Sequence, residues 1–257
     1  AARAAGARQR EAVGGELAVN ELRDNAVKLA LDVECQEMIP ARLEERFPGI
    51  SVLGEEEGGA PHGATEWQWI VDPVDGTVNL YYGIPHFCVA IALQHQKQTM
   101  LAVTYDPIRD ELFTAVRGSG TRLNGREVSV SQRAQLKDAL VATGFAKEKG
   151  LVEAGIERVR FFGTNARKVR MNGCAALDLA YVACGRLDAY LEEGTRLWDL
   201  AGGVLLVECA GGSVDLIERP ELPLSYKVIA SSGRFEVPAI FGDHLARREM
   251  NSLGESP

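Results

Sequence analysis

The sequence has no long apolar run and no excess of positive charge. No segment approaches the roughly 20 uninterrupted apolar residues that a membrane-spanning helix needs. The chain carries 36 acidic against 28 basic residues, which gives a formal net charge of -8 at pH 7. Nucleic acids and anionic membrane surfaces attract basic proteins, so we expect neither as a partner.

Cysteine is scarce and irregularly spaced. The five cysteines include no CxxC pair, and an odd number at irregular intervals argues against a disulfide framework and against a structural zinc site. We therefore expect free thiols in a reducing compartment, and hence a cytoplasmic protein. The arginine-rich start of the chain favours a first helix over a targeting segment.

Several catalytic motifs are missing as well. The sequence contains no GxSxG elbow, no HExxH helix and no P-loop lysine motif. Gly118-Ser-Gly120 does not precede a dinucleotide-binding helix, which excludes a Rossmann-type site. The 257 residues, of which 46% are hydrophobic, instead have the composition of an ordinary globular protein.

Hydrophobic periodicity predicts a first half in which an antiparallel meander packs on helices. Helices are expected at residues 2–20 and 27–47, and an acidic loop at residues 54–63. The predicted strands are short apolar runs bounded by turn residues, at residues 50–53, 67–71, 87–93, 100–105 and 111–116. Asp72-Pro73 is expected to stop the strand that precedes it.

The second half alternates strands with helices. Strands are predicted at residues 140–143, 187–191 and 227–231, and helices at residues 175–183 and 201–210. This alternation indicates α/β organisation. We expect one compact unit made of two halves, residues 1–132 and residues 133–257.

The densest chemical motif is WIVDPVDGTVN at residues 69–79. A hydrophobic strand delivers Asp72 to a sheet edge, while Gly76 permits a tight turn. Asp72 and Asp75 can therefore converge on one site together with the Val74 carbonyl. Hard oxygen ligands of this kind favour Mg²⁺.

The residue after this turn also points to phosphate chemistry. Thr77 is expected to cap a following helix, whose free backbone N–H groups attract phosphate. A DPxDG motif alone is equally compatible with an ordinary strand-to-helix turn, because short motifs give false positives.

Two further acidic segments accompany this motif. Glu55 belongs to GEEEG at residues 54–58, where three consecutive carboxylates repel one another unless solvent or a cation neutralises them. Asp199 belongs to WDLAGG at residues 198–203, where it opens an apolar helix and could serve only as an N-cap. Each segment alone fits a structural role, but together with residues 69–79 they favour a metal site.

These segments, in this order, resemble the inositol monophosphatase family of lithium-sensitive, Mg²⁺-dependent sugar phosphatases. The likeness covers nearly the whole chain. Its matching segments are GEE at 54–56, WIVDPVDGTVN at 69–79, GSG to NG at 118–125, GRLDAYLEEG at 185–194 and WDLAGG at 198–203. The resemblance implies an α/β (α+β) fold, the layered αβαβα sandwich of sugar phosphatases, and a homodimer.

The resemblance also implies the metal ligands. Glu55, Asp72 and the Val74 carbonyl correspond to ligands of a first Mg²⁺, and Asp72, Asp75 and Asp199 to ligands of a second. A third, weaker ion near Glu55 is part of the family pattern. Two ions about 3.5–4 Å apart position a water, polarise the phosphoryl group and neutralise the leaving oxygen.

Catalytic and substrate residues follow from the same likeness. Thr77, together with Asp32 and Glu55, resembles the group that activates the water. The residues that correspond to the substrate site are Asp75, Gly76, Thr77, Ala175, Glu192 and Asp199, with the amides of residues 76 and 77 holding the phosphate and Glu192 accepting a hydrogen bond from a substrate hydroxyl.

The chain departs from the family pattern at three positions. Leu29 replaces a threonine three residues before Asp32, and Lys28 stands at a shifted place. These two changes weaken the expectation of a third ion and of lithium sensitivity. Cys174 stands where threonine is common, which affects the substrate contacts.

The implied reaction is hydrolysis of inositol monophosphate to inositol and phosphate by metal-activated water. The alternatives in the same superfamily are fructose-1,6-bisphosphatase, histidinol-phosphatase and 3′-phosphoadenosine-5′-phosphate phosphatase, and Asn79 favours the polyol branch over the nucleotide branch. The alternative from a different class is a regulatory binding protein that contacts transcription or RNA machinery, against which the retained carboxylates and the acidic charge both weigh.

Overall fold

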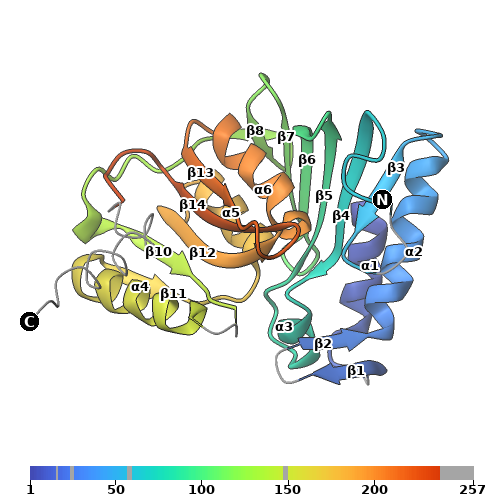
Figure 1. The fold of residues 1–257 in the computed structure, drawn as a ribbon, viewed down its shortest axis with the longest axis horizontal. Helices are drawn as coiled ribbons and strands as arrows, with labels where there is room; N and C mark the ends of the chain where they lie inside the picture. Colours follow the sequence, from blue (N-terminus) through green and yellow to red (C-terminus); the bar gives the residue numbers. More distant parts are fainter. Residues whose placement is uncertain (16, 24–25, 57–59, 147–149, 238–257) are drawn as a thin grey trace, which may run out of the picture.

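The computed structural model describes residues 1–237 except residues 16, 24–25, 57–59 and 147–149. Five layers follow one another in Figure 1: helices α1 and α2, a seven-stranded sheet, helices α5 and α6, a five-stranded sheet, and helix α4. The predicted αβαβα sandwich is therefore confirmed. None of the helices in the described part of the chain is long and apolar enough to span a bilayer.

The seven-stranded sheet runs in the order β3-β4-β5-β6-β7-β8-β9. Its strands are Ser51–Gly54, Trp67–Asp75, Cys88–His95, Gln98–Asp106, Glu111–Val116, Thr121–Leu123 and Arg126–Val128. Each strand from β4 onward pairs antiparallel with the next, which confirms the predicted meander, whereas β3 lies parallel to β4. The loop predicted at residues 54–63 falls partly outside the described residues.

The outer helices are shorter than predicted. Helix α1 spans Ala2–Ala12 and α2 spans Ala30–Glu44, with a hairpin of β1 (Val19–Arg23) and β2 (Ala26–Leu29) between them. Extending either predicted helix over the hairpin residues was wrong. Partly buried Val27 and fully buried Leu29 are two residues apart, which is the spacing of one strand face rather than of a helix.

The five-stranded sheet runs in the order β11-β10-β12-β14-β13. Strands β10 to β14 are Leu140–Thr143, Lys168–Arg170, Ala189–Arg196, Ser213–Glu218 and Ser225–Ser231. The remaining helices are α3 (Thr77–Tyr81), a 3₁₀ turn (Leu136–Asp138), α4 (Leu151–Asn165), α5 (Ala175–Ala183) and α6 (Leu197–Cys209). The sequence predicted α5 and β10 with their observed bounds but missed α4, β11 and β13.

Helices α5 and α6 form the middle layer, covered by a sheet on each side (Figure 1). Their side chains are therefore apolar on nearly all faces, with Leu177, Leu179 and Leu206 fully buried. The two helices approach so closely at Gly203 that a Cβ atom there would lie 2.5 Å from the Leu179 side chain. This contact explains Gly203, the second glycine of WDLAGG.

Strand β4 does not stop at Pro73 but continues to Asp75, which corrects the predicted strand end. Asp72 pairs with Ala90 and Asp75 pairs with Cys88, so three steps along β4 match two along β5. This bulge of one extra residue absorbs the proline. In a regular strand, residues three apart point to opposite faces, so the bulge brings both aspartates to one face.

Candidate metal centre and active site

Three of the predicted metal ligands meet at one point. Asp72 and Asp75 come from the end of β4, and Asp199 comes from the first turn of α6, in the layer next to the sheet. Each offers a carboxylate oxygen, and these oxygens lie within 4.8 Å of one another. Asp72 is 1% and Asp75 9% exposed, so the cluster is largely shielded from water.

Backbone N–H groups hold these carboxylates in place. Asp72 Oδ1 accepts the Val74 N–H at 2.9 Å, and Asp199 Oδ2 accepts the Arg196 N–H at 3.0 Å. Asp199 is the third residue of α6. The sequence had suggested that Asp199 is the N-cap, but the N-cap is Arg196. The Asp199 carboxylate caps the start of the helix and still contributes an oxygen to the cluster.

Asp75 rests on the start of α5. Its Oδ2 accepts the Ala176 N–H at 2.6 Å and the Cys174 thiol at 3.2 Å. Free N–H groups at a helix N-terminus favour negative charge. Sequence reasoning missed Ala176 as a partner because a backbone amide leaves no trace in residue type.

Crowding makes the cluster electrostatically unfavourable without a cation. Burial raises the pKa of Asp72 and Asp75 well above the ordinary range, and the charge of Asp199 adds to both effects. Burial also raises the pKa of Asp199 to about 6. Buried like charges need a compensating cation, and an all-oxygen donor set matches a hard ion such as Mg²⁺.

Glu55 reaches the cluster from the neighbouring strand. It directly follows β3, and its N–H donates to the Val71 carbonyl at 3.2 Å. Its carboxylate interacts with Asp72, while desolvation and the charge of Asp199 raise the pKa of Glu55. The side chain stays open to solvent, which screens part of this effect.

Asp32 lies behind this edge of the sheet, in the first turn of α2. One oxygen accepts the Leu29 N–H at 2.8 Å, and the other is buried without a hydrogen-bond partner. Burial raises the pKa of Asp32 to about 7. Next to it, the Lys28 ammonium forms an ion pair with Glu56, the second of the three glutamates in GEEEG.

Thr77 does not act as the predicted helix cap. The N-cap of α3 is Gly76, whose φ of +93° and close approach to the His86 carbonyl both suit glycine. The Thr77 hydroxyl donates instead to the Val74 carbonyl at 2.9 Å. That carbonyl oxygen is the predicted metal ligand, and its second lone pair remains available.

The two predicted sugar-site residues lie in different elements. Ala175 is the first residue of α5, between the two residues that contact Asp75. Glu192 lies on β12, where its Oε2 accepts the Tyr190 hydroxyl at 2.7 Å. Burial raises the pKa of Glu192 to about 7, and the negative charge of Asp199 adds to this shift, so the two carboxylates interact electrostatically.

Asn79 connects two loops through the hydrogen bonds of its side-chain amide. Its Nδ2 donates to the carbonyls of His86 and Asn172, both at 2.7 Å, and to that of Gly173 at 3.3 Å. Through these contacts α3 fixes the loop that starts α5, and thereby Cys174 against Asp75.

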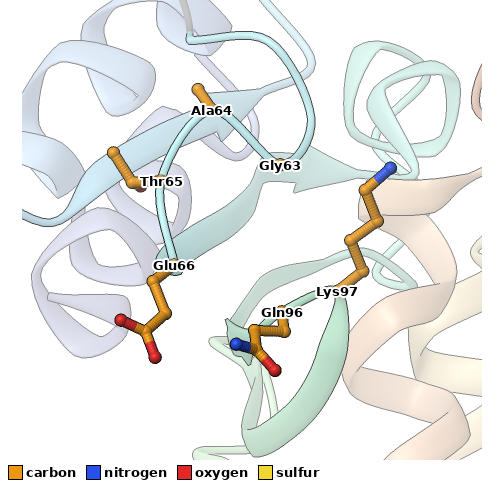
Figure 2. Close-up of a pocket in the computed structure, with 6 residues that line it drawn as sticks. All are labelled: Gly63, Ala64, Thr65, Glu66, Gln96 and Lys97. Atoms are coloured by element: carbon orange, nitrogen blue, oxygen red, sulfur yellow. The ribbon is translucent and has the colours of Figure 1, made fainter.

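An open hollow of about 490 Å³ lies at the other end of β4 and β5 (Figure 2). It is lined by Gly63, Ala64, Thr65, Glu66, Gln96 and Lys97. Strand β4 has nine residues from Trp67 to Asp75, so its ends are eight steps apart, roughly 26 Å at 3.3 Å per residue. The hollow is therefore separate from the carboxylates.

Comparison with known proteins adds an independent line of support. The sequence profile described as the inositol monophosphatase family matches residues 1–246. A Nus factor SuhB from Xylella fastidiosa is 44% identical over 185 residues, which cover 72% of this chain and 66% of that protein. The matched part is thus just under two thirds of that relative.

A plant protein and a solved structure agree with the profile. Inositol monophosphatase 2 from Solanum lycopersicum is 40% identical over 232 residues, which cover 88% of this chain and 84% of that protein. The structure of inositol monophosphatase from Anabaena (Nostoc) sp. PCC 7120 superimposes with a TM-score of 0.78 at 34% identity, covering 97% of this chain and 92% of that one.

Proposed function

Because the chain belongs to the inositol monophosphatase family of phosphomonoesterases, we propose that it hydrolyses a small phosphorylated polyol, with inositol monophosphate as the leading substrate. The buried cluster of Asp72, Asp75 and Asp199 is the observation that carries this proposal. Three carboxylates at one point are costly in a protein that does not bind a cation there.

We infer the positions of two Mg²⁺ ions from the oxygen ligands available. Glu55, Asp72 and the Val74 carbonyl would hold one Mg²⁺, and Asp72, Asp75 and Asp199 would hold a second. When bound, Mg²⁺ neutralises charge on the phosphoryl oxygens and lowers the pKa of an attacking water.

The remaining roles belong to groups around the cluster. Thr77 would orient the attacking water, whose proton would pass to the Asp32 or Glu55 carboxylate. The amides of Gly76 and Thr77 hold the phosphate, at the start of α3. Ala175 and Glu192 would face the alcohol that leaves. Ala175 lies next to the residue whose N–H binds Asp75, and the charge of Asp199 contributes to the raised pKa of Glu192.

A substrate panel tests this function. Phosphate release is measured with Mg²⁺ on inositol 1-phosphate, fructose 1,6-bisphosphate, histidinol phosphate and 3′-phosphoadenosine 5′-phosphate. We expect the highest kcat/KM on the inositol ester. No release from any member of the panel would overturn the proposal, and preference for another ester would reassign the substrate.

Glu192→Gln should weaken binding of the polyol without disabling the hydrolytic site. A hydrogen bond to a charged group contributes about 1.5–3 kcal/mol, so KM for inositol 1-phosphate should rise roughly 10-fold or more. KM for p-nitrophenyl phosphate, which has no neighbouring hydroxyl, should stay unchanged. Tyr190→Phe, which removes the donor to Glu192, is the matched control, and equal effects on both substrates would refute the role.

Lys28→Met should increase the number of ions bound. The Lys28 ammonium already neutralises Glu56 and lowers the pKa of Asp32, so we propose two Mg²⁺ ions, no third, and weak lithium inhibition. Titration with Mn²⁺ in the presence of phosphate should give two equivalents for the wild type and three for the variant. Lys97→Met, at the exposed far end of β5, should match the wild type, and an unchanged stoichiometry in Lys28→Met would contradict the proposal.

A second candidate function comes from the relatives named Nus factor. This name favours a regulatory protein that contacts transcription machinery, as a role beside hydrolysis. Binding to purified RNA polymerase complexes, compared between the wild type and a phosphatase-inactive variant, would test it. Binding that survives loss of activity would establish two separable functions.

We also propose a cytoplasmic homodimer. The apolar side chains of Tyr82, Ile84 and Met171 are 71%, 49% and 54% exposed. Asn79 joins the segments that carry them, since it contacts the carbonyls of residues 86 and 172. A second copy would cover this surface, and light scattering of Ile84→Asp should then show a monomer.

A further inference from the structure

Two cysteines that are far apart in sequence meet directly behind Asp75. The Sγ atoms of Cys88 and Cys174 are 3.7 Å apart, and Cys174 Sγ lies 3.2 Å from Asp75 Oδ2. One ligand atom from each of the three residues lies within 4.8 Å of the others. The irregular spacing of the cysteines had argued against a structural zinc site, but β5 and the start of α5 bring these two together.

The spacing fits a tetrahedral metal site. A disulfide requires sulfur atoms about 2.05 Å apart, and both cysteines are free. In a tetrahedral zinc site with Zn–S bonds of about 2.3 Å and a Zn–O bond of about 2.0 Å, two sulfurs are about 3.8 Å apart and a sulfur and an oxygen about 3.5 Å. The observed distances of 3.7 and 3.2 Å differ from these by only a few tenths of an ångström.

We propose that Cys88, Cys174 and Asp75 form a binding site for a thiophilic divalent cation such as Zn²⁺. Two sulfurs and one carboxylate oxygen are a soft donor set, which discriminates against Mg²⁺. The fourth tetrahedral position remains for water. Binding replaces the two S–H protons by the cation and releases both to solvent, so no oxidant takes part.

The cation enters from the side of Asp75. The side chains of Cys88 and Cys174 are 0% and 2% exposed, whereas Asp75 is 9% exposed. Burial raises the pKa of the Cys88 thiol to about 11 and that of Cys174 above its ordinary value. Metal binding requires the thiolate form, so only a cation with high affinity for sulfur displaces the two thiol protons.

Asp75 belongs to both donor sets, which makes the soft site inhibitory. An ion held between Asp75 and the two sulfurs draws the carboxylate toward α5 and neutralises it, so that it no longer serves the hard-ion site. This consequence rests on the proposed phosphatase function, whereas binding of the soft cation does not.

Direct titration with Cd²⁺ tests the binding. Cadmium–thiolate bonds absorb in the ultraviolet, so the wild type should show this band at one equivalent with release of two protons. Cys88→Ser and Cys174→Ser should each weaken Cd²⁺ binding at least tenfold, and Cys184→Ser, a part-buried thiol elsewhere, should match the wild type. Circular dichroism verifies folding, and Cys88→Ala substitutes for Cys88→Ser if that variant unfolds.

The absence of the band in the wild type, or its persistence in both site variants, would overturn the site. Inhibition supplies a second measurement. Zn²⁺ should inhibit Mg²⁺-dependent phosphate release in the wild type and in Cys184→Ser, and at least tenfold higher Zn²⁺ should be needed in Cys174→Ser, which keeps a donor to Asp75. Equal inhibition of all variants would place the inhibitory ion on carboxylates alone. A protein that binds Cd²⁺ but hydrolyses nothing would refute only the proposed phosphatase function.

Discussion

Asp75→Asn should abolish phosphate release and at the same time make the ion-free protein more stable. Asp75 is one of three carboxylates that meet within 4.8 Å, and an amide neither carries the charge nor binds Mg²⁺ as a carboxylate does. Replacing groups that only orient a metal ligand already costs 10–100-fold. We therefore expect a loss of at least about 100-fold in kcat/KM.

Most substitutions of buried residues lower stability, whereas Asp75→Asn should raise it. The pKa of Asp75 is raised by burial and by the charge of Asp199, which means that its ionised form is disfavoured in the fold. Asparagine removes that charge, yet its oxygen still accepts the Ala176 N–H and the Cys174 thiol. The variant should thus have a higher Tm in EDTA, and added Mg²⁺ should raise that Tm less than in the wild type.

Asp188→Asn is the matched control because Asp188 is a buried carboxylate whose charge is already neutralised. It accepts bonds from Arg133 Nε at 2.7 Å and from the Leu140 N–H at 2.7 Å. A hydrogen bond to a charged group contributes about 1.5–3 kcal/mol, so removing the Asp188 charge should lower Tm with and without Mg²⁺. An Asp75→Asn protein that loses stability as the control does, or keeps its activity, would show that Asp75 is a structural carboxylate.

The sequence alone predicted the part of the site that is formed by residues close together in the chain. Asp72 and Asp75 follow one strand and are three residues apart, so their convergence is a property of one turn. Even here the prediction ended the strand at Val71, before Asp72-Pro73, whereas β4 continues to Asp75. A proline inside a strand normally ends pairing, and only the partner strand shows that a bulge accommodates it.

The remaining contacts depend on the tertiary structure. Asp199 was assigned to the metal centre only because two other acidic segments accompany it and because of the family resemblance. Nothing in WDLAGG alone points to a cluster around β4. Cys88 and Cys174 are 86 residues apart and lie in different layers. Their contact has no sequence pattern, since it arises where α5 packs on β5.

The first hairpin illustrates a conflict between local patterns. The predicted helices at residues 2–20 and 27–47 ran into both ends of the hairpin, over residues 19–20 and 27–29, because the periodicity of the neighbouring segments was extended too far. Burial of Leu29 and the hydrogen bond from its N–H to Asp32 start α2 at Ala30 instead. One oxygen of the Asp32 carboxylate thus fixes the helix start, while the other has no hydrogen-bond partner.

Without Mg²⁺, the stability of the protein should fall as pH rises from 6 to 8. Burial raises the pKa of Asp32 and Glu192 to about 7 and of Asp199 to about 6, and raises those of Asp72 and Asp75 well above the ordinary range. Carboxylates of the unfolded chain titrate near pH 4.

The sign follows from proton linkage. Between the pKa of the unfolded chain and that of the fold, the folded state binds more protons than the unfolded state, so stability decreases with pH. The favourable contribution is complete below about pH 4 and is lost as pH rises through the raised values of about 6 and 7. Each kcal/mol lost lowers Tm by roughly 2–4 °C for a chain of this size.

Mg²⁺ should reverse this trend because it binds the ionised carboxylates. Thermal unfolding in EDTA and in saturating Mg²⁺, each at pH 6 and pH 8, should give a larger Mg²⁺-induced rise in Tm at pH 8. The thiols of Cys88 and Cys174 do not contribute in this window because their pKa values lie above it. A Tm in EDTA that rises from pH 6 to pH 8, or a Mg²⁺ effect of equal size at both, would mean that the raised carboxylates are compensated within the fold and leave no charge for a cation to neutralise.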